Sequence, residues 1–182
     1  MSDAVTTSAP LLVARAEIHV DADPGRVYAV VSDLGRSGEW STECTGGAWV
    51  QGEPGAVGSV FRGENRRGED VVAWAPVVRG AWTTEAEVVA AEPGSAFRWA
   101  MRDSAGRAQE SVWAFEIAAA DGGGATLVHH FRMGRATEGI RKIVSGLDEA
   151  GTARFFAEWG AKLDGDLADT LARIKPVIEK DA

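Results

Sequence analysis

Two adjacent histidines, His129 and His130, are the residues of this chain best suited to proton transfer. A histidine can accept or donate a proton near neutral pH. They lie in the stretch 126–133, where side chains are expected to alternate between two faces of a strand, so that one histidine points inward and the other outward. His129 shares the phase of Leu127 and Phe131 and is the inward residue. It is a candidate catalytic base or ligand-orienting donor, or else a core histidine with satisfied hydrogen bonds.

The other polar residues offer hydrogen bonds but form no recognisable catalytic set. Asn65 and Thr84 fall on inward phases among apolar neighbours, where each could bind a ligand or pair with backbone or water. Cys44 is the single cysteine, so it forms no intramolecular disulfide, and we interpret it as a packed or loop cysteine. Adjacent strand histidines face opposite ways and cannot chelate one metal. The sequence also contains no CxxC, Walker or GxGxxG motif, so we expect no metal and no cofactor.

Tryptophan is frequent in this chain, with seven residues beside a single tyrosine. Several tryptophans fall on the apolar phase of the alternating segments 82–88, 97–101 and 113–117. Tryptophan is large, and its indole N–H needs a partner when buried. A sheet face lined with it therefore has a very bulky core or encloses a space for a ligand. The residues expected to bind a ligand there are Phe61, Asn65, Trp82, Thr84, Trp99, Met101, Trp113, Phe115, His129, Phe131, Phe156, Trp159 and Leu163.

Length and charge narrow the class of protein. A chain of 182 residues is long enough to bury one substantial core. The net charge of −8 argues against nucleic acid as a partner, because phosphate binding relies on clustered Lys and Arg. No apolar run approaches the roughly 20 residues that span a bilayer, and the first ten residues do not resemble a signal peptide. We therefore expect a cytoplasmic protein whose partner is a hydrophobic small molecule. The sequence leaves the oligomeric state open.

Period-two patterns predict an antiparallel meander. A first strand over 12–20 is followed by Asp23-Pro24, a typical start for a helix over 24–33, and by a second short helical turn ending near Trp40. Glutamates of the later strands, such as Glu85 and Glu116, fall on the outward phase and indicate a solvated face. Residues 69–80 are interpreted as a short strand or an ordered loop. The remaining strands are expected at 44–50, 60–66, 82–91, 96–102, 108–118 and 126–133.

The end of the chain changes to a helical period. A short helix is expected around 138–145, and from residue 154 onward apolar residues recur every three or four positions on one long helix. Such a helix can cover the aromatic face of the sheet, and apolar clefts with a few polar groups are common ligand sites. We predict an α+β domain over 12–180 after a flexible lead at 1–11. The stripe consists of Phe156, Trp159, Leu163, Leu167, Leu171, Ile174 and Ile178.

The order of elements and several segments resemble the START-like, or SRPBCC, superfamily, including its polyketide cyclase/dehydrase group. The similar segments are 23–28, 33–49, 57–68 and Glu92-Pro93-Gly94, and the resemblance covers about residues 12–178. It implies a helix-grip fold, in which a curved antiparallel sheet wraps around a long C-terminal helix and two short helices lie near the N-terminus.

The resemblance also implies a class of ligand. The superfamily implies binding of a hydrophobic, aromatic or polyketide-like molecule in a cavity between sheet and helix, for transport or sequestration. Some similar actinobacterial proteins protect an antibiotic producer by binding a toxic enediyne. The alternative is a polyketide aromatase/cyclase or dehydratase, in which His129, helped by Thr84 and Asn65, moves protons in the same cavity. Whether the protein is an enzyme stays open at this point.

Overall fold

A seven-stranded antiparallel sheet forms the framework of the computed structural model, which describes residues 9–69 and 79–180. The spatial order is β1-β7-β6-β5-β4-β3-β2, so strands β2 to β7 form the predicted meander and β1 joins it beside β7. The interpretation of residues 69–80 falls mainly outside the described residues. The strands are β1 (Leu12–Val20), β2 (Cys44–Gln51), β3 (Val60–Arg67), β4 (Gly80–Glu92), β5 (Ala96–Arg102), β6 (Ala108–Ala119) and β7 (Ala125–Met133).

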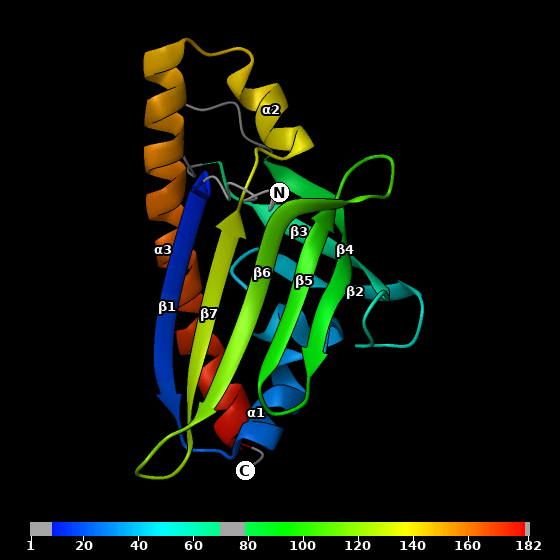
Figure 1. Cartoon of the computed structure of the whole chain (residues 1–182), viewed down its shortest axis with the longest axis vertical. Coiled ribbons are helices and arrows are strands. Elements are labelled where there is room, and N and C mark those ends of the chain that lie inside the picture. The colour runs from blue at the N-terminus through cyan, green and yellow to red at the C-terminus, as the bar shows by residue number, and fades with distance from the viewer. Residues whose placement is uncertain (1–8, 70–78, 181–182) are drawn as a thin grey trace, which may run out of the picture.

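The helices lie behind and at the ends of this sheet. Figure 1 shows α3 (Glu149–Lys180) running along the back of the sheet, with α1 (Pro24–Val31) at one end and α2 (Glu138–Val144) at the other. The 3-10 helix η1 (Leu34–Glu39) follows α1. Asp23 caps α1 as predicted, because its Oδ1 accepts from the amides of Gly25 and Arg26. The predicted helix-grip α+β fold is therefore confirmed.

Helix α3 is longer than its sequence pattern predicted. It begins at Glu149 rather than near residue 154, and its 32 residues span roughly 48 Å at 1.5 Å per residue. In its first turns the fully buried aromatic residue is Phe155, whereas Phe156 is only partly buried. Phe155 packs against Ile140 and Ile143. Phe156 keeps its predicted place on the apolar stripe, where it is partly buried against Phe131 and Met133 of the sheet, whereas Phe155 is covered by α2.

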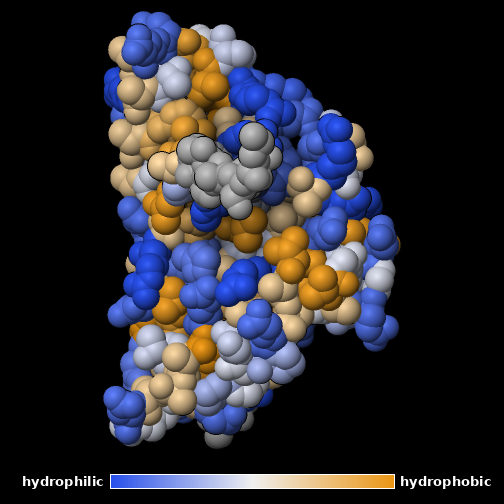
Figure 2. Space-filling model, viewed as in Figure 1, coloured by the Kyte–Doolittle hydropathy of each residue, from blue (hydrophilic) through white to orange (hydrophobic). Residues whose placement is uncertain are grey.

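The two faces of the sheet differ in chemistry. On the inner face, Phe97, Phe115 and Leu127 are fully buried in one cluster with Leu171 and Ile174 of α3. On the outer face, the glutamates are partly exposed as predicted, and they also link neighbouring strands through ion pairs. Figure 2 shows blue hydrophilic side chains on this face, with orange hydrophobic ones between them. The pairs are Arg62–Glu85 (2.8 Å), Arg98–Glu116 (3.0 Å), Arg102–Glu85 (3.2 Å) and His130–Glu116 (3.2 Å).

No helix within residues 9–69 and 79–180 combines the length and apolar character needed to cross a membrane.

Candidate functional site: a cavity between the sheet and helix α3

A cavity of about 440 Å³ lies between the inner face of the sheet, α3, η1 and α2. Its walls are mostly apolar, and all but two of the residues predicted to bind a ligand line it. These are Phe61, Asn65, Trp82, Thr84, Trp99, Met101, Trp113, His129, Phe131, Trp159 and Leu163. Its size and aromatic walls are typical of a small-molecule site.

The two other predicted residues, Phe115 and Phe156, do not line the cavity. Phe115 is fully buried behind the cavity wall. Its ring stacks on the ring of His129, with the two centroids 4.1 Å apart. Phe156 packs against Phe155 where α2 meets α3. Strand phase located the inner face correctly for Phe115, but it does not distinguish a residue of the cavity wall from one packed behind that wall.

His129 is the deepest ionisable residue of the cavity wall and is only 3% exposed. Its Nδ1 lies 2.9 Å from the carbonyl oxygen of Ala114. Burial lowers the pKa of His129 to about 4, and the nearby His130 adds to the effect, while the hydrogen bond to Ala114 opposes it. His129 is therefore neutral at physiological pH and is a weak base.

Asn65 and Thr84 face the cavity as expected, and they bind each other. The Asn65 side-chain amide donates to Thr84 Oγ1 over 3.1 Å and to the Gly63 carbonyl over 3.3 Å. This arrangement satisfies the amide donor but leaves the Asn65 amide oxygen as an acceptor toward the cavity. The pair therefore forms a polar spot on a mostly apolar wall rather than a proton-transfer group.

Trp40, whose direction the sequence did not reveal, also lines the cavity. It packs edge-on against Phe115 at 5.6 Å between ring centroids. Its Nε1 is buried and has no hydrogen-bond partner among the described residues. Trp49 packs against Phe61 instead and lies outside the lining, and Trp74 is not among the described residues. Five of the seven tryptophans thus surround one space: Trp40, Trp82, Trp99, Trp113 and Trp159.

A network of charges closes one side of the cavity, between the ends of β2 and β3 and the middle of α3. Arg67 donates two hydrogen bonds of 2.7 Å to the carboxylate of Glu43. Lys162 donates to the same carboxylate over 2.8 Å and also contacts Asp166. We call Glu43, Arg67, Lys162 and Asp166 the wall network. All four also line a depression on the outer surface, so the network separates the cavity from that depression.

Two tryptophans hold the guanidinium group of the wall network in place. The Arg67 Cζ atom lies 4.5 Å from the ring centroid of Trp82 and 4.9 Å from that of Trp159. Cation–π contacts of this kind strengthen when water is partly excluded, and only 10% of the Arg67 side chain is exposed. Trp82 and Trp159 therefore join the sheet to α3 through a charged residue as well as lining the cavity.

The two carboxylates of the wall network respond differently to their surroundings. Burial alone would raise the pKa of Glu43, but hydrogen bonds from Arg67 and Lys162 outweigh this effect and lower its pKa. Burial raises the pKa of Asp166, and its contact with Lys162 offsets this only in part. Glu43 is therefore firmly ionised and committed to its cations, and it is not available as a general base.

Sequence reasoning missed the wall network, although part of its signal was present. Lys162 and Asp166 are four residues apart, beside Trp159 and Leu163 on the predicted helical stripe. A charged pair next to a buried stripe can be read from helical spacing. Glu43 and Arg67 could not be linked to it, because they reach the helix only through the pairing of β2 with β3.

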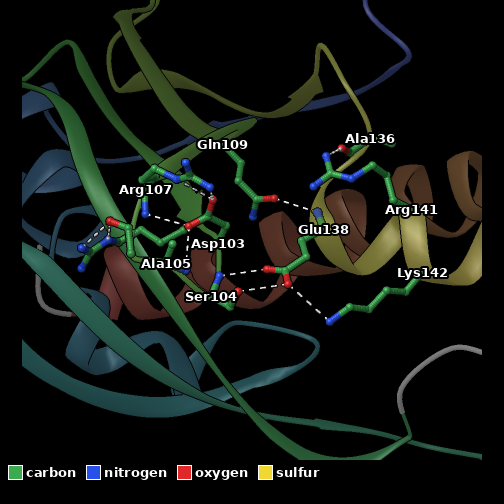
Figure 3. Close-up of polar contacts among 11 residues, drawn as sticks. Asp103, Ser104, Ala105, Arg107, Gln109, Ala136, Glu138, Arg141 and Lys142 are labelled. Carbon is green, nitrogen blue, oxygen red and sulfur yellow. Dashed lines mark hydrogen bonds and ion pairs between the residues drawn. The ribbon is translucent and has the colours of Figure 1, made fainter.

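Helix α2 forms the end wall of the cavity and is fastened to the β5–β6 hairpin. Thr137, Ile140 and Ile143 line the cavity from this side, yet no residue within α2 is fully buried. The Glu138 carboxylate accepts from the Ser104 amide over 2.9 Å and from its hydroxyl over 3.0 Å, as Figure 3 shows. These hydrogen bonds form the Ser104–Glu138 latch. Packing of Ile140 and Ile143 against Phe155 and a hydrogen bond from the Glu138 amide to Gln109 also hold α2, and the latch adds a side-chain restraint between α2 and the hairpin.

Replacing Glu138 with alanine is expected to loosen α2. Amide hydrogen exchange across 138–147 should become several-fold faster, because local opening of α2 then no longer requires the hydrogen bonds of the latch to be broken. Lys142→Ala is the matched control, since it removes only the 3.3 Å ion pair between Lys142 and Glu138. Equal protection of these amides in Glu138→Ala and the unmodified protein would show that the latch does not restrain α2.

Within residues 9–69 and 79–180, no group of three or more His, Cys, Asp or Glu side chains is placed to hold a metal ion. Cys44 lines the cavity, where its sulfur lies 3.1 Å from the Ser37 hydroxyl and donates to the Gly46 carbonyl.

Solved structures similar to this chain share its fold. A Polyketide_cyc-like protein from Corynebacterium glutamicum has a TM-score of 0.62 at 24% identity, and the match covers 96% of this chain and 94% of that one. A protein of unknown function from Staphylococcus aureus has a TM-score of 0.63 at 10% identity, covering 93% and 94%. The di-domain ARO/CYC protein BexL of the BE-7585A biosynthetic pathway has a TM-score of 0.65 at 18% identity. That match covers 95% of this chain and 52% of BexL.

Comparison at the level of sequence gives the family. No curated protein sequence matches the chain. A family model described as polyketide cyclase/dehydrase and lipid transport matches residues 12–179, which is nearly all of the domain built around the cavity. The chain therefore belongs to the polyketide cyclase/dehydrase and lipid transport family of the SRPBCC superfamily.

Proposed function

We propose that this protein binds a hydrophobic, aromatic or polyketide-like small molecule in the cavity between the sheet and α3, and that it transports or sequesters this molecule. The observation that carries the proposal is the wall itself: five tryptophans surround about 440 Å³ of space. Filling that space with a flat apolar molecule would remove apolar surface of both the molecule and the cavity wall from water.

The polar groups of the cavity favour binding over catalysis. His129 is a weak base, and its Nδ1 is bonded to a backbone carbonyl rather than to a carboxylate that would stabilise its charged form. Asn65 and Thr84 bond to each other, and Glu43 is held by two cations. The cavity is therefore equipped to hold and orient a molecule. Sequestration of a toxic aromatic product, as in self-resistance of an antibiotic producer, would need nothing more.

The alternative function is a polyketide aromatase/cyclase or dehydratase, and membership of a family with that description is what favours it. Ring closure depends strongly on how a flexible chain is folded, so a shaped cavity with few polar groups can contribute to it. In that case His129 would take a proton from a bound hydroxyl or carbon acid.

Obstructing the cavity is expected to abolish binding. Ala86 lines the cavity on β4 between Phe61 and Met101 of the neighbouring strands. Anthracene, a flat apolar probe, should quench the tryptophan fluorescence of the unmodified protein. Ala86→Phe should weaken this binding by at least about tenfold, because the added ring occupies the space of the probe.

The matched control for this test is Ala81→Phe, the same substitution at an exposed position of the same strand. It should bind the probe like the unmodified protein. Thermal unfolding of both variants separates loss of the site from loss of the fold. Equal affinity of Ala86→Phe and Ala81→Phe would place the bound probe outside the cavity and contradict the proposal.

A further inference from the structure

The proton on the His129 ring has a defined position. A carbonyl oxygen can only accept a hydrogen bond, so the 2.9 Å contact between Nδ1 and the Ala114 oxygen requires the proton on Nδ1. In the neutral ring, Nε2 then carries a lone pair and can only accept. His129 was considered above as a ligand-orienting donor, but its hydrogen bond makes the free nitrogen an acceptor.

The Nε2 atom faces the cavity. Nε2 has no hydrogen-bond partner among the described residues. It is not completely enclosed either, because Trp40 Nε1 is the only side-chain nitrogen or oxygen of the described residues that is both enclosed and without a partner. His129 belongs to the cavity wall and is otherwise buried. The small accessible surface of Nε2 therefore opens onto the cavity.

Three aromatic rings hold the imidazole in this orientation. Phe115 stacks on it with ring centroids 4.1 Å apart and an angle of 14°. Trp99 and Trp113 flank it at 6.2 Å and 5.8 Å. Turning the ring over would break the bond to Ala114 and leave its carbonyl facing a carbon atom. Nε2 of His129 is thus a fixed hydrogen-bond acceptor among the aromatic rings of the cavity wall.

On the basis of the proposed binding function, we infer that the ligand is an aromatic molecule with a phenolic or enolic hydroxyl that donates to His129 Nε2. Ethers, ketones and carboxylates offer only acceptors, so they would place an oxygen lone pair against the lone pair of Nε2. A hydrocarbon would leave Nε2 desolvated without a partner, which costs binding energy. The lowered pKa of His129 keeps this acceptor neutral at physiological pH.

Three probes of nearly equal shape test this inference: 2-naphthol, 2-methoxynaphthalene and naphthalene, measured by equilibrium dialysis at pH 7. The unmodified protein should bind 2-naphthol about fivefold more tightly than 2-methoxynaphthalene, the effect of one hydrogen bond in an enclosed site. His129→Phe keeps a flat ring on the floor of the cavity but has no acceptor. It should lose this preference and bind naphthalene more tightly than the unmodified protein does, because no acceptor is then left without a partner.

The adjacent histidine supplies the matched control. His130 lies on the outer face beside Glu116, so His130→Phe should keep the preference for 2-naphthol. Nitrogen-15 NMR of labelled histidine adds a test that needs no variant. The Nε2 resonance of His129 should move upfield on adding 2-naphthol and stay in place on adding 2-methoxynaphthalene.

The outcomes separate this inference from the proposed function. If the unmodified protein binds all three probes equally, or if 2-naphthol leaves the Nε2 resonance unmoved, the hydroxyl contact is refuted while the binding function stands. If none of the three probes binds, the proposed function is refuted together with the inference.

Discussion

Replacing Arg67 with alanine is expected to lower the free energy of unfolding by about 2–3 kcal/mol. The substitution removes both hydrogen bonds to Glu43 and both contacts with tryptophan rings. Breaking one partner of a fully buried ion pair costs about 3–5 kcal/mol. The expected loss is smaller here because Lys162 still neutralises Glu43, and because 23% of the Glu43 side chain is exposed and screened by water.

Urea unfolding followed by tryptophan fluorescence measures this loss. Arg67→Lys should recover only part of it, since an ammonium group cannot reproduce the two parallel hydrogen bonds. Arg66→Ala is the matched control on the exposed neighbouring position and should change stability by less than about 0.5 kcal/mol. In a double-mutant cycle, Arg67→Ala and Glu43→Gln should be strongly non-additive. Additive losses would mean that the two side chains do not stabilise each other.

Most of the fold could be predicted from the sequence because its signals are local. Strand alternation places residues such as Trp99 and Trp113 on one face, and that pattern survives folding because one face of the sheet must be buried. The cap formed by Asp23 depends only on the amides two and three positions later in the chain. The first turns of α3 were less predictable, because Phe155 is buried by α2, a partner that no local pattern identifies.

The residues of the site that face inward could be predicted from the sequence, but their hydrogen bonds and ion pairs could not. Phase placed His129 in the cavity, yet its tautomer depends on Ala114 of the neighbouring strand, 15 positions away in sequence. The wall network joins Glu43 to Lys162, which are 119 positions apart. Contacts of this separation are fixed by strand register and helix placement together. Such contacts also fix the direction of the acceptor that His129 presents to the cavity.

Because His129 is buried, we expect the free energy of unfolding to fall strongly at acid pH. Between pH 6.5 and about 4, the unfolded chain takes up a proton at His129 while the native protein does not. Proton uptake therefore lowers the free energy of the unfolded state relative to the native state. The contribution of His129 to stability is complete above pH 6.5 and falls by about 1.4 kcal/mol per pH unit below it. By pH 4 the loss attributable to this one residue should reach about 3 kcal/mol.

Replacing His129 with glutamine isolates this effect, because glutamine can still hydrogen-bond but does not titrate. The charged residues of the wall network titrate in both proteins, so they cancel in the difference between them. The free energy of unfolding, measured in urea at pH 7, 6, 5 and 4.5, should fall more steeply for the unmodified protein than for His129→Gln. His130→Gln, on the outer face, should keep the steep slope. Parallel curves for the unmodified protein and His129→Gln would show that the native state accepts a proton at His129 as easily as the unfolded chain does. In that case burial would not lower the pKa of His129 in the native protein.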